Sequence, residues 1–325
     1  METVTTTNHT NPVQVGFHLP GLRYNYPLNM MTAGLMKSNP EFFREGVYIA
    51  SFFGDFPTTR FNGGRYAGDD QCDERYVRAV ADSIHKAGIP IRYTFTNPLI
   101  TEEDLSDPYS NFCLEVAHDA MNGVLVVSPL LEAYIREHYP LYKLNSSTCK
   151  EIRSVEGLNE ELKKDYDLVV LDYNMNNQFE LLSQIEDKAR CEVLVNSCCV
   201  PNCPRRGAHY REISKMQSTA LDNRTLAPKD RKPVPQWHCS YGEDNTLYTI
   251  MDYPTFVSPD AIWDKYVPMG FRNFKIEGRT ANLFALIDTY CMYLMKPEKR
   301  DEGRLLLTYN LQRSKVITCM RPKRA

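Results

Sequence analysis

Short apolar runs recur along this chain, and each is followed by a segment whose apolar positions return with helical spacing. Such runs are typical of buried strands, and the segments between them are typical of helices that pack on one face. Strand-like runs occupy residues 47–53, 89–96, 123–128, 141–147, 167–173, 191–197 and 271–278.

The clearest helical pattern covers residues 74–87, where Val77, Val80 and Ile84 share one face and Gly88 ends the helix. An eighth strand is expected either at residues 18–22 or at 247–251. Strands that alternate with helices become parallel strands joined by right-handed crossovers. The count favours an α/β fold of the closed (β/α) TIM-like barrel type. Further helices are expected over residues 109–121, 130–138, 178–189 and 259–267.

The chain shows no internal repeat and no convincing linker, so a single domain is expected over residues 1–300. Prolines and charges with few apolar residues occupy 217–236, and we expect an insertion over 217–245 that carries Cys239 toward the carboxyl-terminal mouth of the barrel. The alternative is an ordinary surface loop. Residues 301–325 are expected to form a peripheral basic tail.

Composition and charge limit the partners and the cellular location expected for the protein. The net charge is −3 over 325 residues, which argues against a basic nucleic-acid-binding surface over the whole chain, although the patch at 204–211 leaves contact with RNA open. No apolar run is long enough to span a membrane, and residues 1–12 are too polar for a secretion signal. We therefore expect a cytoplasmic protein with reduced cysteines, either alone or in a homo- or hetero-oligomer.

Three cysteines follow the strand-like run at 191–197 in close succession: Cys198, Cys199 and Cys203. Cys239 lies in a later loop-like segment. Because soft thiolates select iron-sulfur clusters or zinc, these four residues are the expected metal ligands. Cys191 and Cys149 are the substitutes.

Two other interpretations of these cysteines stay open. Free cysteine is a common core residue, so the thiols can be inert and buried. Alternatively, His209 or His238 completes a zinc site, or His209 activates Cys198 or Cys199 as a nucleophile.

Polar residues stand where the predicted strands end, which is where a (β/α) barrel places its chemistry. We expect catalytic roles for Glu277, Arg279, Asn97 and Asp172. A glycine-rich loop after the first strong strand supplies candidate substrate-binding residues, Arg60, Asn62 and Arg65. The alternatives are strand-end caps and turns, a mobile surface loop, and, for the last strand, a buried ladder of Lys275, Glu277 and Arg279 that fills a polar barrel interior.

The segment GFRNFKIEGRT, residues 270–280, resembles the late-strand signature of the prokaryotic collagenase-like (U-32) peptidase family, and residues 144–152 resemble another of its segments. The resemblance implies a barrel-like fold. In several branches of that family it also implies a four-cysteine iron-sulfur (4Fe-4S) cluster that serves oxygen-independent hydroxylation of ubiquinone precursors or RNA bases. Other branches are described as peptidases.

The chain lacks the motifs of serine hydrolases, zinc proteases and dinucleotide-binding folds. We therefore expect an iron-sulfur-dependent modifying enzyme that acts on an RNA base or a small aromatic metabolite, with zinc as the alternative metal. A peptidase and a non-catalytic metal-binding barrel that binds a partner are the alternative functions.

Overall fold

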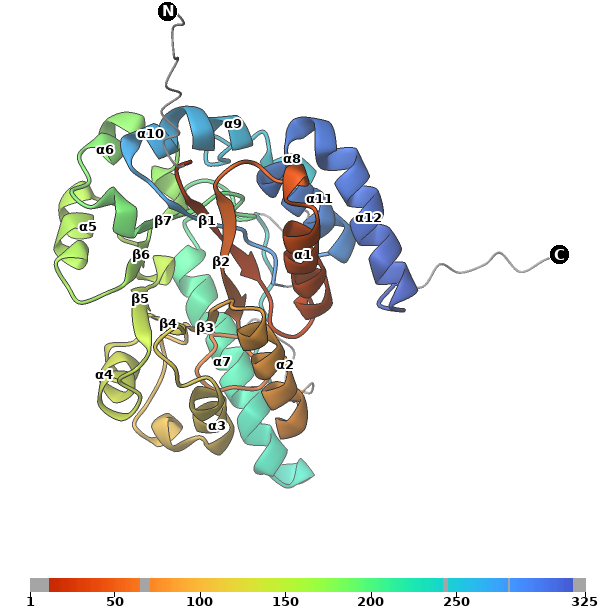
Figure 1. Cartoon of the computed structure of the whole chain (residues 1–325). Coiled ribbons are helices and arrows are strands. Elements are labelled where there is room, and N and C mark those ends of the chain that lie inside the picture. The colour runs from red at the N-terminus through yellow and green to blue at the C-terminus, as the bar shows by residue number, and fades with distance from the viewer. Residues whose placement is uncertain (1–11, 65–70, 242–244, 280, 318–325) are drawn as a thin grey trace, which may run out of the picture.

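The computed structural model describes residues 12–64, 71–241, 245–279 and 281–317. In this part of the chain, eight parallel strands close into a barrel in chain order, and β8 pairs with β1. Figure 1 shows the barrel with helices around it. The predicted (β/α) barrel is confirmed. Its strands are β1 (Val15–Pro20), β2 (Val47–Gly54), β3 (Ile91–Phe95), β4 (Gly123–Val126), β5 (Lys143–Ser146), β6 (Leu168–Val170), β7 (Cys191–Leu194) and β8 (Asn273–Lys275).

All seven predicted runs contain a strand, and the eighth strand is β1, which overlaps the 18–22 option. All six residues of β1 are buried, as expected for a wall strand that faces the interior on one side and helices on the other. The option at 247–251 is wrong, because residues 247–250 form a short helix whose first turn is stabilised by a capping box between Thr246 and Thr249.

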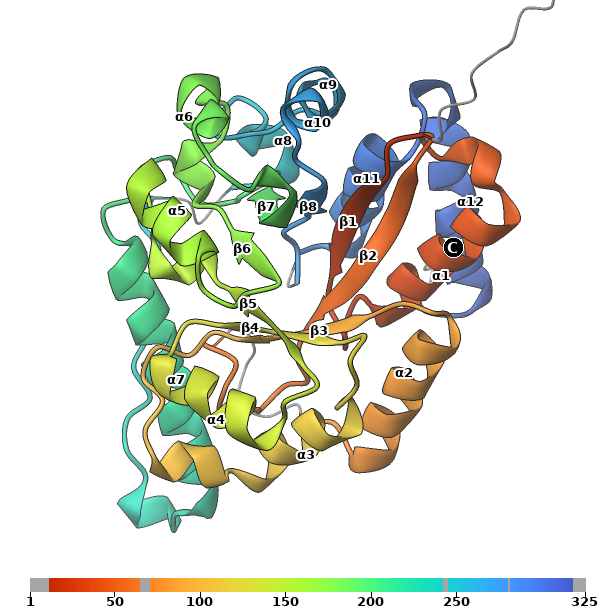
Figure 2. The same ribbon diagram turned by 60° about the vertical axis from the view of Figure 1, so that its left-hand side comes forward.

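The helices form an outer layer, and Figure 2 shows α2 to α6 around the strands. The predicted stripe of α2 is buried, and the side chain of Asp73 caps its amino terminus by accepting from the Tyr76 N–H. The helices predicted over 109–121 and 178–189 are shorter in the structure. The helices are α1 (Tyr26–Ser38), α2 (Glu74–Lys86), α3 (Pro108–Val116), α4 (Pro129–His138), α5 (Val155–Leu162), α6 (Phe179–Ser183), α7 (Arg206–Thr225), α8 (Leu247–Ile250), α9 (Pro259–Ala261), α10 (Val267–Met269), α11 (Leu283–Leu294) and α12 (Arg300–Arg313), with a π-helical turn (Ile262–Tyr266) between α9 and α10.

The insertion between β7 and β8 differs from the prediction, which began it at residue 217. That position lies in the middle of α7, a helix of 20 residues coloured teal in Figure 1. Polar side chains, including Arg206 and Gln217, make up much of its buried face. Its sequence therefore largely lacks an apolar stripe, so hydrophobic periodicity does not predict this helix.

The predicted peripheral tail is also corrected for its first part. Residues 300–313 form α12, which packs on α1 and α11, and its Leu307 and Leu311 are fully buried. Residues 318–325 lie outside the described part of the chain. Among the described residues, no helix has the length and apolar character needed to cross a bilayer.

Candidate active site at the barrel mouth

The barrel interior contains a cluster of charged side chains. Arg92 on β3 forms a bidentate ion pair with Glu192 on β7, in which Nη1 contacts Oε2 and Nη2 lies 3.0 Å from Oε1. Strands β3 and β7 stand on opposite sides of the barrel, so the pair crosses the interior. The two side chains are 3% and 0% exposed. The pair is therefore a polar strut that joins the two walls.

His18 on β1 and Lys275 on β8 complete this cluster. The His18 Nε2 lies 3.2 Å from Glu192 Oε2, and its Nδ1 lies 2.7 Å from Ser51 Oγ. The Lys275 Nζ lies 3.7 Å from Glu192 Oε1 and 4.3 Å from the centre of the Phe53 ring. Three basic side chains thus share one carboxylate.

Burial changes the proton affinity of these groups. Burial lowers the pKa of His18 to about 3 and that of Lys275 to about 7, because neither cation is well solvated in the barrel. Burial alone would raise the pKa of Glu192, but the charge of Arg92, followed by His18 and Lys275, holds it below its usual value. At neutral pH the cluster therefore contains an ionised strut, a neutral imidazole and a lysine divided between amine and ammonium.

Glu277 and Arg279 follow β8 at the carboxyl-terminal mouth. Asn196 at the end of β7 fixes this segment, since its Oδ1 accepts from the Glu277 N–H at 2.7 Å and its Nδ2 donates to the Glu277 carbonyl at 3.1 Å. The Glu277 carboxylate accepts from the Cys198 N–H at 3.2 Å. Glu277 therefore stands beside the cysteine loop.

Arg279 reaches toward the ends of β2 and β3. Its Nη1 donates to Thr94 Oγ1 at 2.5 Å and lies 3.9 Å from Asp55 Oδ1. The Arg279 side chain is 14% exposed, whereas Asp55 is fully buried. The structure thus places both predicted residues of the last strand at the mouth.

Asp172 is buried and anchors α7. Its Oδ2 accepts from Arg206 Nη1 at 2.5 Å, and its Oδ1 accepts from the Asn174 N–H at 2.9 Å. The guanidinium of Arg206 lies over the Tyr173 ring at 4.4 Å, and its Nη2 donates to Thr148 Oγ1 at 2.9 Å. Asp172 therefore holds the first turn of α7 against the end of β6, and its catalytic role stays a prediction.

Asn97 joins two loops of the mouth. Its Nδ2 donates to the Arg60 carbonyl at 2.8 Å, and its Oδ1 accepts from the Leu99 N–H at 2.9 Å. Both ends of the amide are therefore used within the protein. Asn97 therefore holds these loops together, and its catalytic role stays a prediction.

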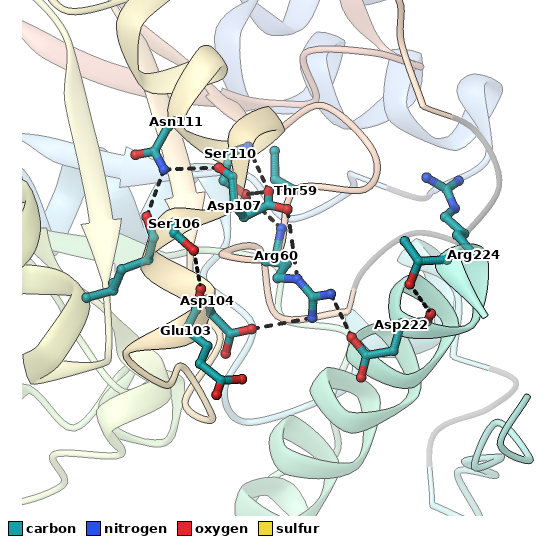
Figure 3. A network of polar contacts seen from close by, with 12 residues as sticks. Thr59, Arg60, Glu103, Asp104, Ser106, Asp107, Ser110, Asn111, Asp222 and Arg224 are labelled. Carbon is teal, nitrogen blue, oxygen red and sulfur yellow. Dashed lines mark hydrogen bonds and ion pairs between the residues drawn. The ribbon is translucent and has the colours of Figure 1, made fainter. Parts of the chain in front are cut away.

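Arg60 is the centre of a polar network between the loop after β2 and α7 (Figure 3). Its Nη2 donates to Asp222 Oδ1 at 2.6 Å, its Nη1 donates to Asp104 Oδ1 at 3.3 Å, and its Nε lies 3.8 Å from Asp107 Oδ1. Three carboxylates thus surround the guanidinium. These carboxylates would repel an anion, and the role of Arg60 in substrate binding stays a prediction.

The rest of the predicted substrate loop has a similar structural role. Asn62 is buried, and its Oδ1 accepts from the Gly64 N–H at 2.8 Å. Gly64 has a φ of +80°, and a β-carbon there would lie 2.0 Å from the Ile213 carbonyl oxygen of α7, so only glycine fits. Arg65 lies outside the described residues.

The cysteine loop connects β7 to α7 beside the mouth. The Cys199 thiol interacts with Cys203 and with the Tyr173 hydroxyl. Burial, assisted by the Glu277 charge, raises the pKa of Cys198 to about 12. Burial also raises the pKa of Cys199 to about 11. Without a metal, both thiols are therefore protonated near neutral pH.

The predicted four-cysteine set is not assembled. The Cys198 Sγ lies 3.9 Å from the Asn196 carbonyl oxygen, and Cys239 belongs to a separate segment whose neighbouring His238 carbonyl accepts from Arg205 at 3.4 Å. Across the described ranges, no group of three or more His, Cys, Asp or Glu side chains is placed to hold a metal ion. As they lie, these residues do not fit a cluster or a zinc ion.

The substitute ligands and the histidines do not complete the predicted metal site. Cys191 is buried in the barrel wall on β7, and its thiol lies 3.4 Å from the Asp187 carbonyl. The His209 ring stacks on Trp237 with the ring centres 5.0 Å apart. Glu277, Tyr173 and Cys203 are among the polar groups that act on the Cys198 and Cys199 thiols. The pairing of a cysteine nucleophile with His209 stays a prediction.

Comparisons with known proteins give a distant likeness to a solved structure. No protein-family model matches this chain, and no curated protein matches it. Among the solved structures, the U32 peptidase Mk0906 aligns over 82% of this chain and 93% of its own, with 13% sequence identity and a TM-score of 0.46. It carries the name of the family that the motif at 270–280 resembles. The barrel itself rests on the strand order of this chain.

The sequence interpretation missed Arg92, Glu192, His18 and Arg206. A signal existed for the first two, because each is a charged residue inside an otherwise apolar strand-like run. Such a residue in a barrel strand needs a partner across the interior, since an unpaired buried charge is costly. No comparable signal marks Arg206, whose partner lies on a distant strand end.

Proposed function

We propose that this protein is an enzyme that modifies a small anionic substrate at the barrel mouth. Arg279 binds the carboxylate or phosphate of the substrate, and Glu277 exchanges a proton with it. The observation that carries this proposal is the succession of Lys275, Glu277 and Arg279, which leads from the barrel interior to its mouth.

The contacts of Arg279 suit such a role. Its Nη1 is engaged by Thr94, while no described residue accepts a hydrogen bond from its Nε or Nη2. A guanidinium with a free edge can bind a carboxylate or a phosphate through two parallel hydrogen bonds. Glu277 is oriented by the Cys198 N–H, which leaves its other oxygen for proton transfer.

Thermal unfolding with benzoate, succinate or inorganic phosphate tests the anion site. We expect at least one of these anions to raise the Tm of the wild type, because a ligand at a hundred times its Kd adds about 2.7 kcal/mol of stability. Arg279→Ala should abolish this shift, and Arg313→Ala, at an exposed position near the end of α12, should keep it. An equal shift in Arg279→Ala would overturn the proposal.

For the reaction, we propose oxygen-independent hydroxylation-type chemistry on an RNA base or a small aromatic substrate, with an iron-sulfur centre. The support is the position of the cysteine loop beside Glu277 and the contact between Cys199 and Cys203. The other ligands would have to move from their described positions, so no catalytic step is assigned to the centre. The visible spectrum and the iron, sulfide and zinc content after anaerobic purification test it.

A matched pair of cysteine variants sharpens this measurement. Cys199→Ser should remove the metal, whereas Cys291→Ser should retain it, because Cys291 is buried in α11. Wild-type protein free of iron, sulfide and zinc would exclude the centre.

Peptidase activity is the alternative, supported by the motif at 270–280. Cleavage of unmodified peptides by metal-free protein would favour it, although the protonated thiols disfavour a cysteine nucleophile.

A further inference from the structure

The amino group of Lys275 has few partners for a buried lysine. No described residue accepts a hydrogen bond from its Nζ, and the contacting carboxylate oxygen, Glu192 Oε1, lies 3.7 Å away. By contrast, Lys150 and Lys164 each place Nζ 2.6 Å from a Glu161 oxygen. The Glu192 carboxylate is already engaged by the bidentate contact of Arg92. Lys275 is therefore the loosely held member of the interior cluster.

Lys275 is also the member of this cluster that solvent reaches most. Its side chain is 9% exposed, compared with 5% for His18, 3% for Arg92 and 0% for Glu192. It ends β8, immediately below the segment that carries Glu277 to the mouth. A small molecule that enters the mouth therefore meets this amine before the rest of the cluster.

A second polar group in the interior lacks a partner. Asn145 on β5 is 2% exposed, and no described residue accepts a hydrogen bond from its Nδ2. A β-carbon built on Gly123 would lie 3.4 Å from Asn145 Oδ1 and 3.5 Å from Arg92 Cγ, which places this amide beside the strut. Buried donors are normally satisfied, so this one points to a ligand or an ordered water in the interior.

We propose that Lys275 is a nucleophile that forms an imine with a small carbonyl compound, such as a 2-oxo acid, whose anionic group is bound by Arg279. The inference rests on the proposed function for the anion, and it adds the substrate class and the attacking atom. The charged groups nearest the amine are Glu192 and Arg92 of the strut, and Arg279 follows on the same chain segment. Lys275 ends β8 and Arg279 lies four residues further on at the mouth, so a ligand at the mouth can contact both side chains.

The reaction balances without an oxidant or reductant. The lone pair of neutral Nζ attacks the carbonyl carbon, and a C–N bond forms while the carbonyl π bond breaks. Nitrogen loses a proton and oxygen gains one, which gives a carbinolamine, and loss of water then leaves the imine. Glu277 is the acid-base group available for these proton transfers. Burial of Lys275 lowers its pKa to about 7, which keeps enough free amine for the attack.

Reductive trapping tests the proposal on the intact protein. Wild type is incubated at pH 7 with pyruvate or with propanal and reduced with cyanoborohydride, and the modified lysines are identified by peptide mass spectrometry. An ordinary lysine, with a pKa near 10.4, is less than about 0.1% amine at pH 7. We therefore expect Lys275 to be labelled at least roughly tenfold faster than Lys163, whose side chain is 60% exposed.

Variants separate this inference from the proposed function. Lys275→Arg keeps the charge and should remove the labelled site, and Arg279→Ala should slow labelling by pyruvate but not by propanal. Labelling of Lys275 by propanal alone would support the nucleophile and overturn the anion site. Labelling no faster than at Lys163 with both probes would overturn the imine, even where an anion still raises the Tm through Arg279.

Discussion

Two arginine-centred networks in this protein use the same chemistry in different surroundings. Arg92 meets Glu192 inside the barrel, where the side chains are 3% and 0% exposed. Arg60 meets Asp222 at the edge of α7, where they are 22% and 44% exposed (Figure 3). Water can replace a lost partner at the edge but not in the barrel. The same ion pair should therefore differ in energetic importance by several-fold between the two regions.

Removing one half of the interior strut should have the largest effect. Glu192→Ala leaves Arg92, Lys275 and His18 around an empty position, and we expect a loss of about 3–5 kcal/mol in the free energy of unfolding. Urea denaturation measures this loss. The double variant Arg92→Met with Glu192→Leu should recover much of it, because no charge of the strut is then left unpaired. A loss below about 1 kcal/mol in the single variant would contradict the strut.

The anchor of α7 should rank second. Arg206→Met removes the guanidinium from Asp172, which keeps its hydrogen bonds from Asn174, so we expect a smaller loss of about 2–3 kcal/mol. The effect should be local, with faster amide hydrogen exchange in α7 than in the barrel strands. Arg211→Met, at an exposed position of the same helix, is the control. Equal exchange in both variants would show that Arg206 does not hold the helix.

The interior cluster should also make stability depend on pH. The pKa of His18 is about 3 in the folded protein and about 6.5 when unfolded, so between these values the unfolded chain binds a proton that the folded protein does not. Stability should therefore fall as the pH decreases through this window, by at most about 1.4 kcal/mol per pH unit. His18→Asn should flatten that slope of the free energy of unfolding against pH. If the slope is unchanged in His18→Asn, groups other than His18 cause the pH dependence.

Lys275 predicts the same sign in a higher range. Its pKa is about 7 in the folded protein and 10.5 in the unfolded chain, so the unfolded chain binds the extra proton between these values. Stability should rise with pH from about 7 to 10.5, and Lys275→Met should lose this rise. Calorimetric Tm values across this range check the prediction. An equal rise of Tm in the wild type and in Lys275→Met would mean that groups other than Lys275 cause the pH dependence.

The edge network should show the smallest effect. Asp222→Asn removes one of the three carboxylates around Arg60, and because both side chains are partly solvated we expect a loss of at most about 1 kcal/mol. The loss should shrink further in 1 M salt, which screens exposed charges. Urea denaturation at low and high salt measures it. A loss as large as that of Glu192→Ala would erase the distinction between the two regions.

Two helices show how far the sequence pattern reaches. The helix α2 is visible in the sequence because apolar residues such as Val77, Val80 and Ile84 form its buried face. The helix α7 is hidden, because Arg206 and Gln217 on its buried face pair with residues from distant loops, and Gln217 donates to the Thr59 carbonyl at 2.6 Å. Burial by apolar contact is periodic in sequence, whereas burial by polar pairing depends on partners elsewhere.

The site was predictable to a similar extent. The strand-end rule correctly placed Glu277 and Arg279 at the mouth, because residues that follow a barrel strand emerge there whatever their partners are. The same rule selected Asn97 and Arg60, whose described contacts join neighbouring segments and whose catalytic and substrate-binding roles stay predictions. Position along a strand thus tells where a side chain emerges, but not what it meets.

By itself, the sequence determined the barrel, the order of its strands and the residues that reach its mouth, because apolar periodicity and strand-helix alternation are local properties of the chain. Only the tertiary structure decided which charges meet. It brought Arg92 to Glu192 across the barrel, bound Arg60 to three carboxylates and kept Cys239 apart from Cys199 and Cys203. The physical reason is that an ion pair or a shared ligand depends on distances of a few ångströms between residues far apart in sequence, which no local pattern encodes.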